Sequence, residues 1–394
     1  MRDFRLIVNR GVREALEKNI TAKGSMTKFS QTLAHEYRIN SSHAHTAMSI
    51  ALSLGKSHRT RIRKGKGGKV PYCLKPFLNA DDQTFHLDPF TGHIRLSLRN
   101  GEWVGFNLCL SDYHRSVLAT GKVKQMRLRP DRASIIIEKE IPPPCDPKAL
   151  LALDTNESSL DGIFLAAGTM IPITVPYPDV RRVQHVHFNR RRRLGRKKAH
   201  DRRVGKRLGG REGKREKDRV NQRLHLVSKG IVEEAKAQQA AIVLEDLHLP
   251  KGGGKNQHIR RRLSIWPQRK LHQQIEYKAE ERGVLIIKVN PAYTSKTCPR
   301  CGVIKERRNR VGRVFVCGNC GWRCDRQLNA GLNICRTVLQ ESSKGILNAE
   351  LRGLRLDPDA LPHDARRFLY SPGNAGAHER SGREGRELVG PRTR

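Results

Sequence analysis

The amino-acid sequence predicts a multidomain α/β protein. The chain has 394 residues, which is enough for two or three domains with real cores. The pattern of apolar residues changes twice along it, from helical spacing to β-prone segments, and then to apolar strands that alternate with helices. Four of the nine cysteines form two Cys-x-x-Cys pairs, a spacing typical of an inserted metal-binding ribbon.

The first region, residues 1–70, is expected to be helical. Apolar residues recur at helical spacing around Leu33 and again over 43–54, and Asn40 to Ser42 between the two runs form a turn and cap signal. Two such helices could form a helix–turn–helix or part of a plain helical bundle, and we favour the bundle.

The second region, residues 71–147, is expected to be β-rich. Turn signals such as Asn100-Gly101 separate its segments, and the three prolines at 142–144 mark a boundary. We predict an antiparallel sheet or a small barrel. The expected strands are Thr84–Asp88, His93–Leu98, Glu102–Leu110, Lys122–Arg129 and Ala133–Glu138.

The third region, residues 148–290, is expected to hold one large sheet. Three consecutive strands followed by helices alternating with strands is the order of a ribonuclease H-type fold. The expected strands are Leu150–Asp154, Asp161–Ala166, Ile171–Val175, Ala241–Glu245 and Val284–Val289, with helices over 181–207, 214–238 and 267–282.

The cysteine pairs and the end of the chain complete the predicted organisation. The pairs fall in residues 291–324, and a closing helix is expected over Asn329–Leu339, within residues 325–345. Residues 346–394 are basic and rich in Pro, Gly, Arg and Asp, so we expect a disordered tail there.

Two carboxylates stand at the ends of apolar strands. Asp154 follows Leu150–Leu153 and Glu245 follows Ala241–Leu244. Active sites of α/β sheets gather at such carboxyl ends. Phosphodiester hydrolysis by two metal ions needs several carboxylates to hold the cations about 4 Å apart, and magnesium prefers oxygen ligands. The alternative is that both acids only mark where the strands leave the sheet for water.

The cysteine spacing is the sharper signal. Cys298 and Cys301 form one pair, Cys317 and Cys320 the other, and fifteen residues separate the pairs. This spacing suits a tetrahedral zinc ribbon, a closed structural site that does no chemistry itself. The alternative is four reduced thiols without a metal. Cys324 lies close enough to compete for the ion, although we expect it to stay outside the site.

The charge indicates a polyanionic partner. Lys and Arg number 77 against 38 acidic residues, a net charge of +39. Nucleic acid is the leading candidate, because neutralising phosphates releases condensed counterions. A membrane surface is the rival, but no apolar stretch reaches the roughly 18 residues that span a bilayer and no signal peptide is evident. We therefore expect a cytoplasmic, nucleoid-associated protein without a membrane partner.

A dense basic run lies in the first charged helix. On a helix its cations would cover nearly all faces, so we expect this segment not to pack into a core but to contact phosphates, the alternative being a solvated face. Its members are Arg190, Arg191, Arg192, Arg193, Arg196, Lys197, Lys198, Arg202 and Arg203.

The motifs over residues 150–340 resemble those of TnpB proteins and the related type V CRISPR effectors. Ala152–Asn156 and Val243–Leu247 resemble the first two RuvC motifs, and Tyr277–Gly283, Pro291–Gly302 and Asn329–Ile334 match the family closely. The resemblance implies a ribonuclease H-like RuvC nuclease domain with an inserted zinc ribbon. It also implies a helical recognition region over 1–70 and a β-rich wedge-like domain over 71–147.

The resemblance further implies an RNA-guided DNA endonuclease. Its partners would be a guide RNA and a double-stranded DNA target with a short flanking motif. Asp154, Glu245 and Asp325 would be the catalytic ligands of two magnesium ions. One departure matters, because the family's third acid falls on Gln327 here and Asp325 is the nearest carboxylate. The alternatives are therefore an RNA-guided DNA-binding protein with an impaired RuvC site, or a transposase that works without RNA.

Overall fold

The computed structural model describes residues 1–99, 101–177, 179–198, 201–247, 265–304, 314–340, 348–361 and 367–368. The chain divides into two units, Met1–Glu140 and Ile141–Arg394, and the division falls just before the three prolines that were expected to mark a boundary. Each unit has its own buried core, and both contain helices and strands, so the predicted multidomain α/β organisation is confirmed.

The first unit begins with helices that pack against strands. Its helices are α1 (Arg2–Glu17), α2 (Thr27–Glu36) and α3 (Ser41–Arg63). Asn40 caps α3 as expected, since its Oδ1 accepts a hydrogen bond from the backbone N–H of Ser42 at 2.9 Å. The apolar faces of α1 and α3 form one continuous core with strand residues such as Ile94 and Met126. The helical and β-rich regions therefore share one core.

The strands of this unit form two three-stranded sheets, in the orders β1-β5-β6 and β2-β3-β4. The prediction of a single sheet or barrel is therefore wrong. The reason is an unexpected first strand, Leu78–Asp81, which pairs with the fifth and draws it away from the fourth. The strands are β1 (Leu78–Asp81), β2 (Phe85–Leu87), β3 (His93–Arg99), β4 (Glu102–Asn107), β5 (Lys122–Arg129) and β6 (Arg132–Glu138).

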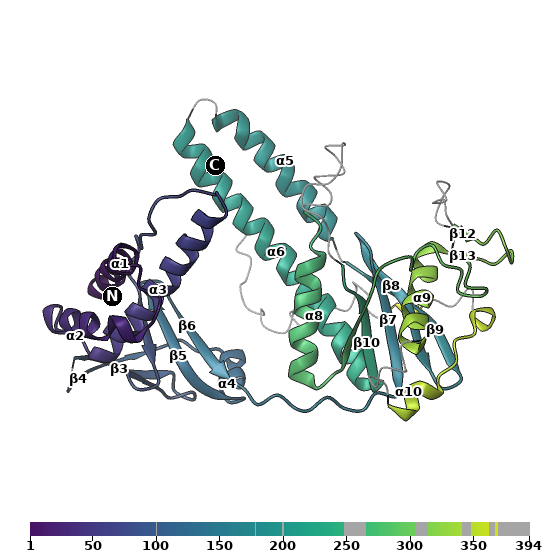
Figure 1. The fold of residues 1–394 in the computed structure, drawn as a ribbon, viewed down its shortest axis with the longest axis horizontal. Helices are drawn as coiled ribbons and strands as arrows, with labels where there is room; N and C mark the ends of the chain where they lie inside the picture. Colours follow the sequence, from purple (N-terminus) through teal and green to yellow (C-terminus); the bar gives the residue numbers. More distant parts are fainter. Residues whose placement is uncertain are drawn as a thin grey trace, which may run out of the picture. The chain divides into compact units, whose positions relative to one another are not determined.

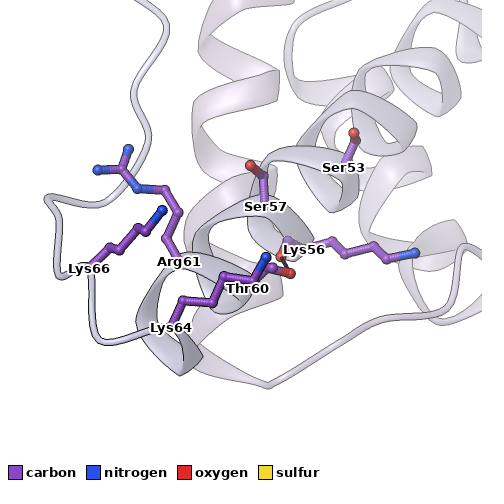
Figure 2. Close-up of a pocket in the computed structure, with 7 residues that line it drawn as sticks. All are labelled: Ser53, Lys56, Ser57, Thr60, Arg61, Lys64 and Lys66. Atoms are coloured by element: carbon purple, nitrogen blue, oxygen red, sulfur yellow. Dashed lines mark hydrogen bonds between the residues drawn. The ribbon is translucent and has the colours of Figure 1, made fainter. Parts of the chain in front are cut away.

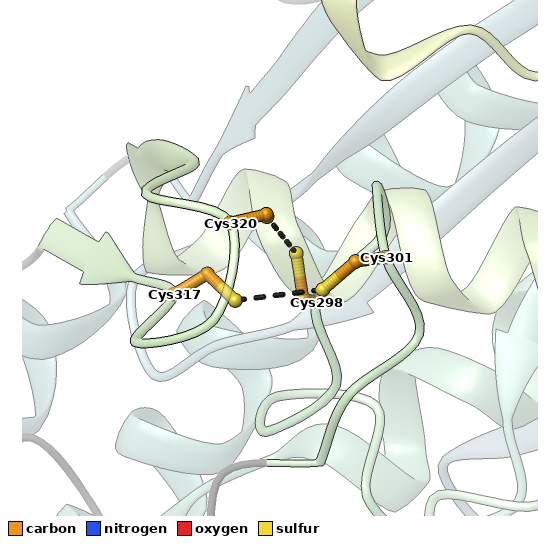
Figure 3. A group of neighbouring side chains, drawn as sticks. All are labelled: Cys298, Cys301, Cys317 and Cys320. Carbon is orange, nitrogen blue, oxygen red and sulfur yellow. Dashed lines mark hydrogen bonds between the residues drawn. The ribbon is translucent and has the colours of Figure 1, made fainter.

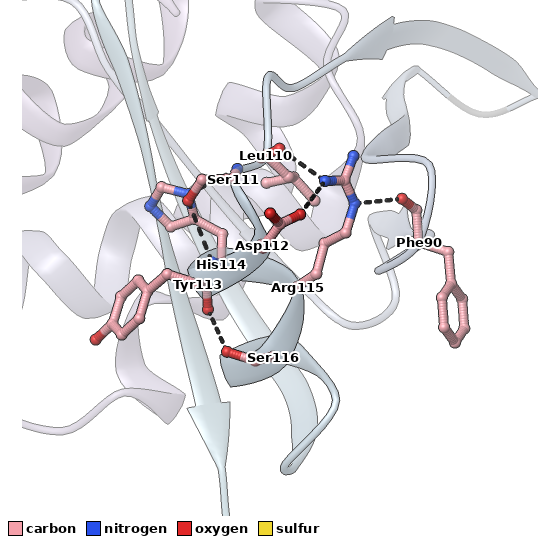
Figure 4. Close-up of polar contacts among 8 residues, drawn as sticks. All are labelled: Phe90, Leu110, Ser111, Asp112, Tyr113, His114, Arg115 and Ser116. Atoms are coloured by element: carbon pink, nitrogen blue, oxygen red, sulfur yellow. Dashed lines mark hydrogen bonds and ion pairs between the residues drawn. The ribbon is translucent and has the colours of Figure 1, made fainter. Parts of the chain in front are cut away.

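A short helix, α4 (Asp112–Leu118), connects the two sheets and was not predicted. Ser111 caps it through a hydrogen-bonded box with His114. Figure 4 shows how Arg115 braces this connection: Nε donates to the carbonyl of Phe90 and Nη1 to that of Leu110, both at 3.0 Å. The helix thus ties the loop before β3 to the end of β4.

The second unit is built on a six-stranded sheet in the order β11-β10-β7-β8-β9-β14. β7, β8 and β9 are antiparallel, whereas β10 runs parallel to β7 and β11 runs parallel to β10. The five strands predicted here are confirmed, with shifts of one or two residues at their ends. They are β7 (Ala149–Thr155), β8 (Ser159–Ala166), β9 (Thr169–Pro176), β10 (Ala240–Glu245) and β11 (Ile286–Val289).

Helices cover both faces of this sheet (Figure 1). One face packs against α6 (Arg202–Ala237) and α8 (Gln268–Arg282), and the other packs against α9 (Arg326–Gln340) and the segments that carry the cysteine pairs. Strand alternation separates the two cores, because Leu151 and Leu153 face the first and Leu150 and Ala152 the second.

Part of the expected disordered tail is ordered. Residues 349–353 form α10, and Leu351, Leu354 and Leu361 are buried in the core beneath α9. β14 (Arg367–Phe368) adds a parallel strand beside β9. The prediction of disorder was wrong for this stretch, because its leucines are too widely spaced to give a local signal. Residues 369–394 lie outside the described part of the chain.

Candidate active site and metal centre

Strand register brings two predicted carboxylates together. Leu153 of β7 is paired with Leu244 of β10 in a parallel ladder, so the next residues, Asp154 and Glu245, are neighbours at the carboxyl ends of adjacent strands. Both side chains lie on the face that carries α9. Glu245 is buried, with 5% of its surface exposed, and Asp154 is partly exposed at the rim.

Burial raises the pKa of both carboxyl groups of this pair. Burial, followed by the charge of Glu245, raises the pKa of Asp154 to about 7. Burial also raises the pKa of Glu245, although hydrogen bonds from Thr294 and Asp154 oppose the rise. Two adjacent carboxylates that cannot both ionise easily without a cation are a donor set that suits a divalent metal.

A third acid, Asp161, faces Asp154 across β7 and β8 and was not selected from the sequence. It is buried, and its carboxylate accepts hydrogen bonds from Ser159 Oγ at 2.5 Å, Thr174 Oγ1 at 2.9 Å and Asn156 Nδ2 at 3.2 Å. Both of its oxygens therefore accept hydrogen bonds, and its charge contributes to raising the pKa of Asp154. No strand-end signal marks this residue, because it stands near the start of β8.

A residue of the loop that leads to the cysteines donates a hydrogen bond to Glu245. Thr294 Oγ1 donates to Glu245 Oε1 at 2.5 Å, and both side chains are buried. The carbonyl of Thr294 accepts in turn from Asn333 Nδ2 of α9 at 2.8 Å, and the same amide donates to the carbonyl of Thr297 at 2.7 Å. Asn333 therefore fixes the loop, and the loop fixes the carboxylate. Both residues lie in motifs that the sequence singled out, without this role.

Asp325 is placed differently from the other two acids. It ends strand β13 (Arg323–Asp325), and α9 begins at Arg326, so the expectation that the closing helix starts at Asn329 is wrong. Asp325 Oδ1 accepts from the backbone N–H of Gln327 at 2.8 Å, which is the geometry of a helix cap. This local hydrogen bond favours starting the helix directly after the aspartate.

The described residues contain one compact group of potential metal ligands, and it consists of cysteines. The sulfur atoms of Cys298, Cys301, Cys317 and Cys320 all lie within 4.8 Å of one another, as Figure 3 illustrates. The acids Asp154, Glu245 and Asp325 do not form such a group, so the carboxyl group of Asp325 does not lie beside those of Asp154 and Glu245. Cys324 is buried outside the cluster, as expected.

The cysteine geometry fits a tetrahedral ion. Two sulfur–sulfur distances across the cluster, Cys298–Cys320 and Cys301–Cys317, are both 3.6 Å. Sulfur ligands about 2.3 Å from a zinc ion at tetrahedral angles would lie about 3.8 Å apart. Gly302 and Gly321 follow the second cysteine of each pair with φ of 76° and 71°, a left-handed conformation that glycine adopts without strain.

The thiols are divided between low and high pKa. A backbone hydrogen bond from Val303 lowers the pKa of Cys301 to about 6, and one from Cys320 lowers the pKa of Cys317. Burial raises the pKa of Cys298 to about 12. Backbone N–H groups directed at sulfur stabilise thiolates, the form that binds metal. The cluster could therefore hold a zinc ion.

The basic run lies on a helical hairpin. α5 (Val180–Lys198) packs along α6, and its core residues, Val180 and Val183, precede the basic run, whose described members stay outside the core but include residues with partners on α6. Its inner side is held by a buried pair, His187 Nδ1 with Glu212 Oε1 at 2.7 Å, and Glu212 also pairs with Arg190 at 3.4 Å. Arg191 pairs with Glu216. The acids of α6 supply partners that α5 alone does not reveal.

The remaining members of the basic run divide into two sets. Among the described side chains, Arg192, Arg193, Arg196 and Arg203 are exposed and form no ion pair, so they stay available to phosphates. The side chains of Lys197, Lys198 and Arg202 lie outside the described part of the chain.

A second basic surface lies on α3 and was missed from the sequence. A pocket of about 450 Å³ opens along the last turns of this helix and the residues after it. Figure 2 shows cations and hydroxyl groups around it and no carboxylate. The repeated Lys and Arg after residue 55 were the available signal. The lining residues are Ser53, Lys56, Ser57, Thr60, Arg61, Lys64 and Lys66.

Comparison with known proteins gives the family. A TnpB-like protein of Methanocaldococcus jannaschii is 31% identical over 245 residues, which cover 59% of this chain and 86% of that protein. The chain belongs to the TnpB-like protein family. Residues 269–334 of this TnpB-like chain, from α8 through the cysteine cluster to α9, match the family model described as Cas12f1-like, TNB domain.

Two further similarities concern CRISPR-associated proteins. The Cas12f1 endodeoxyribonuclease of Sulfoacidibacillus thermotolerans is 39% identical over 112 residues, but these are only 25% of its length. A structure described as a Cas12f1–sgRNA–target DNA complex matches the fold with a TM-score of 0.59 at 14% identity, covering 84% of this chain and 81% of that one. No helix in the described ranges is long and apolar enough to cross a bilayer.

The cysteine cluster predicts one tightly bound zinc per chain. We expect Cys298→Ser to remove the metal and lower the thermal stability of the second unit, since a structural zinc site contributes folding free energy directly. The matched control is Cys109→Ser, an exposed cysteine outside the cluster. Elemental analysis and thermal denaturation are the measurements. The assignment would be refuted if wild-type protein contained no zinc and melted at the same temperature as Cys298→Ser.

The acidic pair predicts a pH-dependent stability. The pKa of Asp154 is raised to about 7 in the folded chain, so the folded state holds a proton that the unfolded state loses near pH 4. Stability should therefore fall as pH rises from about 4 to 7. Asp154→Asn should reduce this fall and leave the part that Glu245 contributes, whereas Asp218→Asn, an exposed site on α6, should leave it unchanged. Urea denaturation without added magnesium at pH 5 and pH 8 tests it; equal losses in wild type and Asp154→Asn would contradict it.

Proposed function

We propose that this chain is an RNA-guided DNA endonuclease with a ribonuclease H-like RuvC domain. The observation that carries the proposal is the pair Asp154 and Glu245, adjacent at the carboxyl ends of β7 and β10 in a TnpB-like chain. The relatives named endodeoxyribonucleases support cutting of DNA as the reaction. The strand order of the large sheet, with three antiparallel strands followed by two parallel ones, supports the ribonuclease H-like assignment.

The residues of this site would hold two magnesium ions. Asp154 and Glu245 offer a carboxylate pair whose buried negative charges a divalent cation would offset. Asp325 would join them from the start of α9 when DNA binds. Bound magnesium would activate water for attack on phosphorus and neutralise the charge that develops there. Thr294 would keep Glu245 in one orientation throughout.

The other parts of the chain would hold nucleic acid. Residues 1–70 would be the recognition region, 71–147 the wedge-like domain, 148–290 the main part of the nuclease domain and 291–324 a zinc ribbon. A net charge of +39 requires a polyanion of matching size, and guide RNA with double-stranded target DNA supplies one. The solved complex with sgRNA and target DNA, which shares this fold, supports the same partners.

A second function is an RNA-guided DNA-binding protein that does not cut. The observation in its favour is that Asp325 acts as a helix cap and that Gln327 carries no charge to offset a cation. A third, an RNA-independent transposase, would not co-purify with a specific RNA. Sequencing the RNA bound to the purified protein separates this last function from the first two.

Three substitutions at the start of α9 test the nuclease assignment. Asp325→Ala removes both the cap and the charge, whereas Asp325→Asn keeps a capping side chain and removes only the charge. If Asp325 is a metal ligand, both variants should lose magnesium-dependent cleavage, as Asp154→Ala should, while guided binding to DNA persists. Gln327→Asp should change cutting little. Cleavage and binding of the same guided duplex are the measurements.

The outcomes of this series are distinct. Normal cutting by Asp325→Asn would limit the aspartate to a capping role and overturn its assignment as a ligand. Failure of the natural protein to cut a target that it binds, together with cutting by Gln327→Asp, would establish the DNA-binding function instead. Cutting by Asp154→Ala would overturn the assignment of the whole site.

The hairpin predicts a graded salt dependence. Arg192→Ala with Arg193→Ala removes two exposed cations, whereas Arg190→Ala with Arg191→Ala removes two that pair with Glu212 and Glu216. The first double variant should flatten the log–log dependence of RNA affinity on salt, by roughly 0.7–0.9 for each phosphate that the protein no longer neutralises. The second should flatten it less and reduce stability more. If both double variants kept the wild-type dependence of RNA affinity on salt, the basic run would be a solvated face that contacts no phosphate.

A further inference from the structure

One face of the sheet β2-β3-β4 carries a patch that neither the core nor the nuclease site uses. The opposite face buries Phe85, Ile94 and Leu96. Because side chains alternate along a strand, His86 and Arg95, which are paired across β2 and β3, point away from that core. β4 is an edge strand, and its Trp103 is 37% exposed.

The side chains of this patch are organised around the indole ring. The rings of Trp103 and His86 lie 5.4 Å apart with 19° between their planes, and the guanidinium of Arg95 lies 5.6 Å from the Trp103 ring centre. We call His86, Arg95 and Trp103 the stacking patch. Farther along the same face, His93 Nδ1 lies 2.7 Å from Asn107 Oδ1, which adds a polar group beside the aromatic one.

The charge around the patch suits a polyanion. Glu102 is the one acidic residue in the three strands, and it pairs with Arg99 at 3.7 Å. A tryptophan that served only to stabilise the sheet would gain more from the apolar face, where Ile94 and Leu96 are buried. Here it lies instead on the solvent side beside a cation and an imidazole, where a planar base could stack while the cation contacts a phosphate.

We propose that the stacking patch binds an unpaired base of the RNA that this protein carries, with Arg95 also contacting the adjoining phosphate. The proposal rests on the RNA-guided function above and adds a site outside the nuclease domain. RNA is the occupant that fits best, because proteins recognise its loops and ends by stacking splayed-out bases on aromatic rings and arginine planes. Stacking also tolerates any base, so the patch would position RNA without reading its sequence.

The test compares RNA affinity between variants of the full chain, with the RNA that co-purifies with wild type as the probe. Trp103→Ala should weaken binding by roughly 5- to 150-fold, and Trp103→Phe should restore most of it. The salt slope should stay unchanged, because a stacked base releases no counterions. Phe90→Ala, which removes an aromatic side chain that is 76% exposed in the same unit, is the matched control and should bind normally.

A second readout does not depend on affinity. RNA substituted with 4-thiouridine should crosslink to a peptide that contains Trp103 in wild type and lose that crosslink in Trp103→Ala. Unchanged affinity of Trp103→Ala, or an equal loss in Phe90→Ala, would overturn the patch while leaving RNA-guided cutting intact. Retained RNA affinity with weakened binding of single-stranded DNA would overturn RNA as the occupant. Wild-type protein that binds no RNA would refute the proposed function as well as the patch.

Discussion

The burial of two neighbouring carboxyl groups is the constraint on which the second unit depends. The pairing of Leu153 with Leu244 in the parallel ladder between β7 and β10 places Asp154 and Glu245 side by side. Glu245 is buried, so the protein must supply its hydrogen bonds. Thr294 supplies one to Glu245. The segment that ends in the cysteine cluster is therefore part of the acidic site, and disorder in the cluster would be transmitted to Glu245 through four residues of chain.

Close packing of α9 on the sheet makes this arrangement possible. A side chain at Gly331 would meet the Cα of Gly162 at 2.5 Å, and one at Gly162 would meet the carbonyl oxygen of Ala152 at 1.8 Å. The absence of a side chain at Gly331 lets α9 lie close to the backbone of β8, whereas the absence of one at Gly162 lets β8 lie close to β7. From that depth Asn333 reaches the backbone of the cysteine-bearing loop. Within the motif Asn329–Ile334, Gly331 thus permits the close approach to the sheet, and Asn333 makes the hydrogen bonds to the loop.

The sequence was sufficient where the signal is local and insufficient where partners are distant. Apolar runs ending in an acid located β7 and β10, and cysteine spacing located the cluster, because each pattern lies within a few residues. The start of α9 was misplaced, since the cap hydrogen bond that the backbone N–H of Gln327 donates to Asp325 outweighs the apolar periodicity that begins later. The ordered leucines after Asn348 and the pairing of β1 with β5 depend on surfaces formed by remote segments. No short stretch of the sequence contains both partners of these contacts.

The distribution of positive charge follows the same division between local and long-range effects. Part of the α5 run is neutralised within the hairpin by Glu212 and Glu216, so a count of arginines overstates what is available to a ligand. The exposed remainder and the α3 pocket present cations with hydroxyl groups, a chemistry that contacts phosphates and carries no sequence information. Such a protein can hold an RNA–DNA duplex by its shape alone, and base pairing is then left to choose the target. Phosphate contacts alone let a nucleic-acid strand slide along the protein. A single aromatic contact would fix the register of the strand, because one base would be stacked at one place.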